Sequence, residues 1–260
     1  MTLKLVILSD LHIVPEGETS LGLDTTERLQ HGIAAIHARH ADADLVLVAG
    51  DLADHGDLAS YERLKDVLST LRLPLELTIG NHDDRPAFLT VFGAAQAAPT
   101  GFIDRVIDCK GYRIILLDSA IELGRHDGRL EAEQLDWLAA RLDEAEDRPV
   151  IVVLHHHANP LSTAVDEIIL QNGAELAEVL ARHPDIRQVI AGHVHYTSTA
   201  IWHGIAFTTL AGGHYSVTIP LDKSEPQRLW GPGQMAVILA DADQTLVHFD
   251  NYLDGNATLD

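Results

Sequence analysis

Five short apolar runs in this chain each end in a polar cluster, and this arrangement constrains the fold more than any other feature. The runs occupy residues 3–8, 45–49, 75–79, 150–154 and 189–191. Because they are short and separated by helix-like segments, they predict buried strands of an α/β fold. The clusters that follow them are Asp10-Leu11-His12, Gly50-Asp51, Gly80-Asn81-His82-Asp83, His155-His156-His157 and Gly192-His193-Val194-His195. Ligands bind at the carboxyl edge of such sheets, so we expect the clusters to meet in one site.

The side chains of these clusters predict a metal site. Imidazole, carboxylate and amide ligands without a thiolate suit Mn, Fe, Zn or Co better than an iron–sulfur cluster, a copper–thiolate centre or an all-oxygen calcium site. The candidate ligands are Asp10, His12, Asp51, Asn81, one histidine of residues 155–157, His193 and His195. They are too many for one four-coordinate ion, so we expect two divalent ions, about 3.5–4 Å apart, that share Asp51. We also expect Asp10 and His12, and likewise His193 and His195, to project to one side of an extended segment.

The order of the motifs D-x-H, GD, GNHD, H and GHxH resembles that of the calcineurin-like metallophosphoesterase superfamily, over residues 3 to about 214. Residues 50–54 and 80–85 resemble its bacterial class III cyclic nucleotide phosphodiesterases and the related glycerophosphodiesterases. The resemblance implies a four-layer α/β/β/α sandwich of two mixed β-sheets flanked by helices. It implies one metal at Asp10, His12, Asp51 and His195, and a second at Asp51, Asn81, His155 and His193.

The same resemblance implies roles for the neighbouring residues. His82 would face the substrate as a general acid or an electrostatic stabiliser, with Asp83 orienting its imidazole; a purely structural histidine is the alternative. His156 or His157 is a candidate phosphate contact, with a structural role as the alternative for either, and His214 matches a pocket histidine of relatives. The implied reaction is attack on phosphorus by a hydroxide that two metals share, with expulsion of an alcohol. No G-x-S-x-G motif indicates a serine nucleophile, and the single cysteine, Cys109, lies outside every motif.

Position 55 favours a diester substrate over a monoester. Phosphoprotein phosphatases carry GDxxDRG, whose arginine can bind a dianionic phosphate in a bidentate fork. In this chain His55 takes the place of that arginine. We therefore expect a small phosphodiester, such as a cyclic nucleotide or a glycerophosphodiester. A phosphomonoesterase, a phosphonate monoester hydrolase or a nuclease of the same superfamily is an alternative, as is a non-catalytic interaction protein on the same fold.

Length and local patterns predict one domain over residues 1–260. An N-cap at Asp24 with an apolar stripe behind it predicts a helix, and further stripes predict helices near residues 61–71 and 135–142. Lys110 and Gly111 predict a hairpin turn. Residues 213–235, with three prolines, depart from the strand pattern and are expected to cap the pocket or to mediate assembly into a homodimer or higher homo-oligomer, as in related enzymes.

Charge and hydropathy limit the partners and the location. The formal net charge of −21 argues against a long nucleic-acid partner, because proteins that bind nucleic acids normally present basic grooves. No apolar run approaches the ~20 residues that a membrane span requires, so no membrane partner is expected. A strand-like segment from residue 3 leaves no room for a signal peptide, and one cysteine excludes an internal disulfide. We expect a cytoplasmic enzyme.

Overall fold

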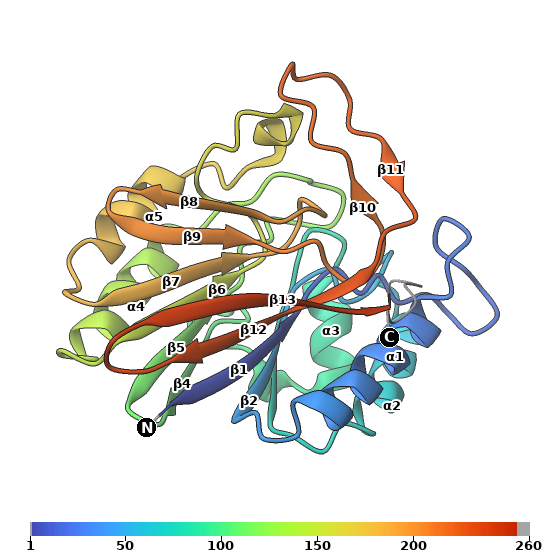
Figure 1. Ribbon diagram of the computed structural model, residues 1–260, viewed down its shortest axis with the longest axis horizontal. Helices are drawn as coiled ribbons and strands as arrows, with labels where there is room; N and C mark the ends of the chain where they lie inside the picture. Colours follow the sequence, from blue (N-terminus) through green and yellow to red (C-terminus); the bar gives the residue numbers. More distant parts are fainter. Residues whose placement is uncertain (1, 254–260) are drawn as a thin grey trace, which may run out of the picture.

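Two mixed β-sheets stacked face to face form the centre of the computed structural model, which describes residues 2–253 (Figure 1). The first sheet has the strand order β13 (Thr245–Leu253), β12 (Gly233–Ala240), β1 (Leu3–Leu8), β2 (Leu45–Ala49) and β3 (Leu75–Thr78). The second has the order β4 (Arg105–Cys109), β5 (Tyr112–Leu117), β6 (Val150–Leu154), β7 (Ile186–Ala191), β9 (Ile205–Thr209) and β8 (Ser198–Trp202).

Helices cover the outer face of each sheet. The first sheet packs against α1 (Thr25–Arg39), α2 (Leu58–Leu68) and α3 (Arg85–Phe92), and the second against α4 (Ala132–Asp143) and α5 (Gly173–Leu180). Short 3₁₀ helices, η1 (Ala94–Gln96) and η2 (Ala164–Ile168), and a small two-stranded sheet of β10 (Ser216–Val217) and β11 (Arg228–Leu229) complete the fold. The four-layer α/β/β/α sandwich is confirmed.

The central strands are apolar on both faces because both faces are buried. In β1, Leu3, Leu5 and Ile7 pack into the core between the two sheets. The alternate residues Val6 and Leu8 pack against the helices outside the first sheet. This two-residue alternation is a property of the extended backbone, and it explains why the strand appears in the sequence as an almost continuous apolar run.

Local signals place the helix and the turn where the sequence predicts them. The side chain of Asp24 accepts a hydrogen bond from the backbone N–H of Glu27 at 3.0 Å, which caps α1. Between β4 and β5, Lys110 and Gly111 have φ angles of 48° and 84°. Two successive left-handed residues form the type of turn that matches the twist of a two-residue hairpin. Both predictions are confirmed.

Parallel strands bring the polar clusters together. β1, β2 and β3 are parallel neighbours in the first sheet, and β5, β6 and β7 are parallel neighbours in the second. The five clusters follow the carboxyl ends of β1, β2, β3, β6 and β7, as predicted. Within residues 2–253, none of the helices combines the length and the apolar character that crossing a membrane requires.

Candidate metal centre

The loops after β1 and β2 are joined by backbone hydrogen bonds. The N–H groups of Leu11 and His12 both donate to the carbonyl oxygen of Asp51, at 2.8 and 3.0 Å. Asp10, His12 and Asp51 have left-handed φ angles of 53°, 46° and 48°. Such angles cost non-glycine residues of order 1–3 kcal/mol each and persist where the surroundings enforce them. The expected extended geometry is therefore wrong for this loop: the hydrogen bonds hold its side chains in place through a strained backbone.

Two glycines allow the close approach of the candidate ligands. A Cβ atom on Gly80 would lie 2.3 Å from Oδ1 of Asp51, and one on Gly50 would lie 2.6 Å from Nδ1 of His155. Gly50 also has a φ angle of 83°. Any side chain at either position would displace a candidate ligand, so the glycines before Asp51 and Asn81 are steric requirements of the site.

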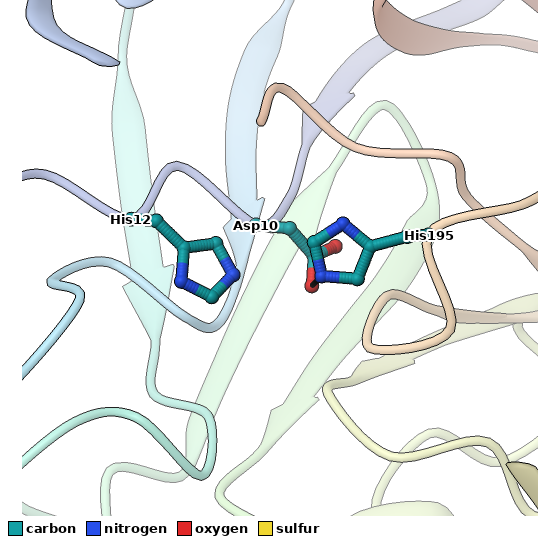
Figure 2. A group of neighbouring side chains, drawn as sticks. All are labelled: Asp10, His12 and His195. Atoms are coloured by element: carbon teal, nitrogen blue, oxygen red, sulfur yellow. Dashed lines mark ion pairs between the residues drawn. The ribbon is translucent and has the colours of Figure 1, made fainter. Parts of the chain in front are cut away.

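A first group of ligand-type side chains comprises Asp10, His12 and His195 (Figure 2). Its ligand atoms all lie within 4.8 Å of one another, although the residues come from the loops after β1 and β7. Nε2 of His195 is 3.6 Å from Oδ1 of Asp10, and Nε2 of His12 is 3.5 Å from Oδ2 of Asp51. Asp51 thus adjoins this group, as the resemblance implies.

A second group comprises Asp51, His155 and His193, again with ligand atoms within 4.8 Å. Nε2 of His155 lies 3.2 Å from Oδ2 of Asp51 and 3.2 Å from Oδ1 of Asn81. Asp51 is therefore next to both groups. His193 and His195 fall into different groups, so the expectation that this pair projects to one side is wrong: both residues have left-handed φ angles, of 74° and 55°.

The second nitrogen of each imidazole is held by a partner outside the groups. Nδ1 of His12 lies 2.9 Å from Oδ1 of Asp54. The other partners are backbone carbonyl oxygens: Ala49 for Nδ1 of His155, Ile168 for Nε2 of His193 and Tyr215 for Nδ1 of His195. Such contacts select the tautomer and leave the opposite nitrogen free to bind metal. Among the described residues, the buried Nε2 of His12 has no hydrogen-bond partner, which fits a metal ligand.

Charge in the site also suits divalent cations. Burial opposes ionisation of Asp51, but His155, His82 and His12 hold its pKa well below the usual range, so it is a carboxylate. Burial lowers the pKa of His193 and of His195, which keeps both imidazoles neutral at neutral pH. At His155 burial also lowers the pKa, but the carboxylate of Asp51 outweighs it and raises the pKa to about 9, so a cation that binds there displaces a proton. Carboxylate and neutral imidazole are the forms that bind metal ions. The residues present therefore fit a metal centre.

A cavity of about 370 Å³ opens beside the two groups and is lined by His12, Asp51, Asn81, His193 and His195 together with His82, His214, Tyr215 and Arg228. We call it the metal cavity. Nδ1 of His82 lies 2.8 Å from the carbonyl oxygen of Asp54, and its backbone N–H donates to Oδ1 of Asp51 at 2.9 Å. A ligand atom of His82 lies within 4.8 Å of ligand atoms of His12 and Asp51. His82 thus reaches both the cavity and the ligand groups.

Asp83 does not orient His82, and this expectation is wrong. Its carboxylate accepts hydrogen bonds from the backbone N–H groups of Leu52, Ala53 and Gly80, at 2.8–3.0 Å, and from the hydroxyl of Tyr61 at 2.9 Å. These donors belong to the loops after β2 and β3 and to α2. Asp83 therefore fastens together the loops that carry Asp51 and Asn81.

The two remaining predicted substrate contacts differ in their surroundings. His156 is fully buried, its Nδ1 lies 2.8 Å from Oγ of Ser119, and it is not among the residues that line the metal cavity. The expected phosphate contact of His156 is therefore wrong, because neighbouring side chains enclose its ring. His214 does line the cavity, with its ring centroid 4.7 Å from that of His12.

Three residues of the site were not predicted as site residues. Asp54 contacts His12, and its spacing from Asp51 in the motif G-D-x-x-D is a signal that could have indicated it. The ring of Tyr215 stacks on that of His195, with centroids 4.0 Å apart and an interplanar angle of 9°. The guanidinium of Arg228 lies over Tyr215, 5.5 Å from its centroid. Tyr215 and Arg228 lie outside every motif, so no local signal indicated them.

Comparisons with known proteins agree with this geometry. The model of the calcineurin-like phosphoesterase family matches residues 3–197. A probable cyclic nucleotide phosphodiesterase of Rhodopseudomonas palustris is 34% identical over 95% of this chain and 91% of its own. The 3′,5′-cyclic adenosine monophosphate phosphodiesterase CpdA of Pseudomonas aeruginosa is 36% identical over 74% of this chain and 69% of its own. The crystal structure of a dimetal phosphatase from Danio rerio shares the fold, with a TM-score of 0.72, 17% identity and coverage of 97% of both chains.

Proposed function

Since the chain belongs to the calcineurin-like phosphoesterase family and is a metal-dependent phosphoesterase, we propose that its substrates are small phosphodiesters of the cyclic nucleotide or glycerophosphodiester type. One observation carries the proposal: two groups of ligand-type side chains meet at Asp51 beside a cavity that His82 lines. The ligand positions all hold ligand-type residues, which argues against a non-catalytic interaction protein on this fold.

Two divalent ions, drawn from Mn, Fe, Zn and Co, are the proposed cofactors. One would be held by Asp10, His12, Asp51 and His195, and the other by Asp51, Asn81, His155 and His193. When bound, such ions supply the Lewis acidity that activates water and neutralises charge on a phosphoryl group. The protein contributes the donor set, the tautomers of its histidines and the strained loops that bring them together.

His82 is the proposed proton donor to the leaving alcohol. Its Nδ1 is engaged by the carbonyl oxygen of Asp54, and its backbone is anchored on Asp51. Nε2 is therefore the nitrogen that faces a substrate in the metal cavity, and it donates a proton when the ring is an imidazolium with both nitrogens protonated. A general acid in this position typically contributes about 10²–10⁴-fold to the rate.

The relatives named as cyclic nucleotide phosphodiesterases support a diester substrate, and so does position 55. The side chain of His55 is 72% exposed and lines the rim of the metal cavity, with Nε2 3.5 Å from Oδ2 of Asp54. A neutral imidazole has at most one hydrogen-bond donor, so His55 cannot bind a dianionic phosphate through two parallel hydrogen bonds as an arginine does. A phosphodiester carries one negative charge, so it needs less positive charge from the protein than a dianionic monoester does.

A hydrolysis panel on protein of defined metal content tests the proposal. The substrates are cyclic adenosine monophosphate, glycerophosphoethanolamine, a phenylphosphonate ester and p-nitrophenyl phosphate. We expect the highest kcat/KM for one of the first two, and no activity in Asp51→Ala purified in parallel, which controls for a contaminating enzyme. A higher kcat/KM for the monoester or for the phosphonate ester would overturn the substrate assignment.

The proposal also covers the number of domains, the role of residues 213–235 and the oligomeric state. We propose a single domain in which residues 213–235 cap the metal cavity, since Tyr215 and Arg228 of this segment line it. The same segment exposes Leu221 and Trp230, by 74% and 77%, which favours assembly of two copies through it. Light scattering at several concentrations tests the homodimer. The cytoplasmic location and the absence of a long nucleic-acid partner stay predictions.

A further inference from the structure

A second cavity, of about 460 Å³, adjoins the metal cavity. The two share Ile168, His193, His195, Tyr215 and Arg228 in their walls. The second cavity is completed by Val165 of η2, by Val194, by Val217 of β10 and by Glu225 and Pro226 of the segment between β10 and β11. We call this second cavity the side chamber. It borders the proposed metal ligands, yet none of the chemistry proposed above uses it.

The walls of the side chamber suit a flat organic group. Val165, Val194 and Val217 give it an apolar lining. At the boundary with the metal cavity, the ring of Tyr215 lies between the imidazole of His195 and the guanidinium of Arg228. Planar heteroaromatic groups stack on guanidinium planes, and apolar cavities with a few polar groups are typical of small-molecule sites.

The lining of the side chamber includes two charged residues. Arg228 and Glu225 come from the exposed part of the segment, and each contributes one charge to the lining. A guanidinium donates hydrogen bonds only, and a carboxylate accepts them, so the pair can serve a ring with both acceptor and donor atoms on its edge.

We propose that the side chamber binds the heteroaromatic substituent of a phosphodiester whose phosphate lies in the metal cavity, and that Arg228 determines the preference for that substituent. The proposal rests on the proposed function, because it places the phosphate between the two ligand groups. A phosphate there is next to His193 and His195, where the two cavities meet, so one of its ester substituents extends into the chamber. Nucleoside phosphodiesters are the matching substrate class.

Binding measurements test the chamber without turnover. Calorimetry on manganese-loaded protein compares adenosine 5′-monophosphate with inorganic phosphate, and the ratio of their Kd values isolates the nucleoside contribution. We expect the wild type to bind the nucleotide at least about tenfold more tightly, since stacking of one base contributes about that much or more. Val217→Trp, which fills the chamber, and Arg228→Gln should each reduce this preference about tenfold.

Lys223→Gln is the matched control, because it removes a positive charge from the same segment at a position that lines neither cavity. Its Kd ratio should equal that of the wild type. The chamber proposal is overturned if the wild type does not prefer the nucleotide, or if the ratio is unchanged in both Val217→Trp and Arg228→Gln. Equal weakening of both probes by Arg228→Gln would place this guanidinium at the phosphate and overturn its role in selecting the substituent.

Activity measurements separate this proposal from the proposed function. We compare kcat/KM for cyclic adenosine monophosphate with that for methyl p-nitrophenyl phosphate, which lacks a nucleoside. In Arg228→Gln, KM for the cyclic nucleotide should rise about tenfold at constant kcat, whereas the small diester should change less than about twofold. If the wild type hydrolyses neither diester, the proposed function fails, and the calorimetric ratio still decides whether the chamber binds a nucleoside.

Discussion

Nδ1 of His12 lies 2.9 Å from Oδ1 of Asp54, and this contact determines which nitrogen of His12 faces Asp51. Burial favours the neutral acid at Asp54, but the bond to His12 outweighs it and lowers the pKa of Asp54 to about 2. The carboxylate therefore accepts the Nδ1 proton, and Nε2 faces Oδ2 of Asp51 at 3.5 Å. Partners of this kind orient a metal-binding histidine and raise its basicity.

Asp54→Ala should weaken metal binding by about 10 to 100-fold, because His12 loses the partner that selects its tautomer. Asp54→Asn should lose less, since its amide oxygen can still accept the Nδ1 proton. Competition with a chelator at fixed pH measures both affinities. Asp66→Ala, an exposed residue of α2, serves as the control. Wild-type affinity in Asp54→Ala would show that the contact has no influence on the metals.

Elemental analysis of metal-saturated protein should approach two ions per chain. The physical reason is that Asp51 adjoins both ligand groups, so one carboxylate can serve two cations. Asp51→Ala should therefore weaken both sites together, while His195→Ala should weaken mainly one. A saturated wild-type stoichiometry of one ion would contradict the binuclear centre.

His82→Ala should keep its metal content and lose about 10²–10⁴-fold in kcat. The loss should be greater for diesters with alkyl leaving groups than for nitrophenyl esters, since a poor leaving group depends more on protonation. Paired kinetics and elemental analysis of the same preparations provide the test. Equal losses on both leaving groups would remove the general-acid role, and loss of metal would make His82 a ligand.

The ratio of kcat/KM for bis-p-nitrophenyl phosphate to that for p-nitrophenyl phosphate should exceed one at matched pH and metal content. His55→Arg should move this ratio toward the monoester, because a permanently charged guanidinium, which binds phosphate through two hydrogen bonds, would then lie at the rim of the metal cavity. His31→Arg, on the exposed face of α1, is a control for added charge. An unchanged ratio in His55→Arg would refute the argument from this position.

The free energy of unfolding should depend on the titration of Asp104. Burial raises the pKa of Asp104 to about 7, and the neighbouring charge of Asp118 acts in the same direction. Between the unfolded value of about 3.9 and the folded value, the native state binds the extra proton. The contribution of Asp104 is therefore fully present at low pH and is lost as the pH rises through that window.

Urea unfolding of metal-free protein between about pH 4.5 and 7.5 measures this effect. The free energy of unfolding of the wild type, relative to Asp104→Asn, should fall as the pH rises. Asp108→Asn is the comparison, because two contacts with Arg113, at 2.8 and 2.9 Å, lower the pKa of Asp108 to about 2. The difference in the free energy of unfolding between Asp108→Asn and the wild type should be constant over this pH range. A constant difference for Asp104→Asn as well would contradict the raised pKa.

The sequence alone determined the features that depend on neighbours along the chain. The cap at Asp24 and the turn at Lys110 and Gly111 follow from the side chain or the backbone freedom of a few residues. The buried strands follow from runs such as residues 3–8, whose apolar side chains face two cores. Because parallel strands share one carboxyl edge, the position of each polar cluster after its strand was enough to predict the candidate metal centre.

Only the tertiary structure decided which group each site residue contacts. The backbone N–H of His193 meets Oδ1 of Asp10 at 3.0 Å across 183 residues of sequence, and Arg228 reaches the metal cavity from a segment without a motif. Asp83 binds three backbone N–H groups that no residue pattern can reveal. Hydrogen bonds and left-handed φ angles such as those of His193 and His195 are set by packing between distant segments, which is why their partners had to be seen in three dimensions.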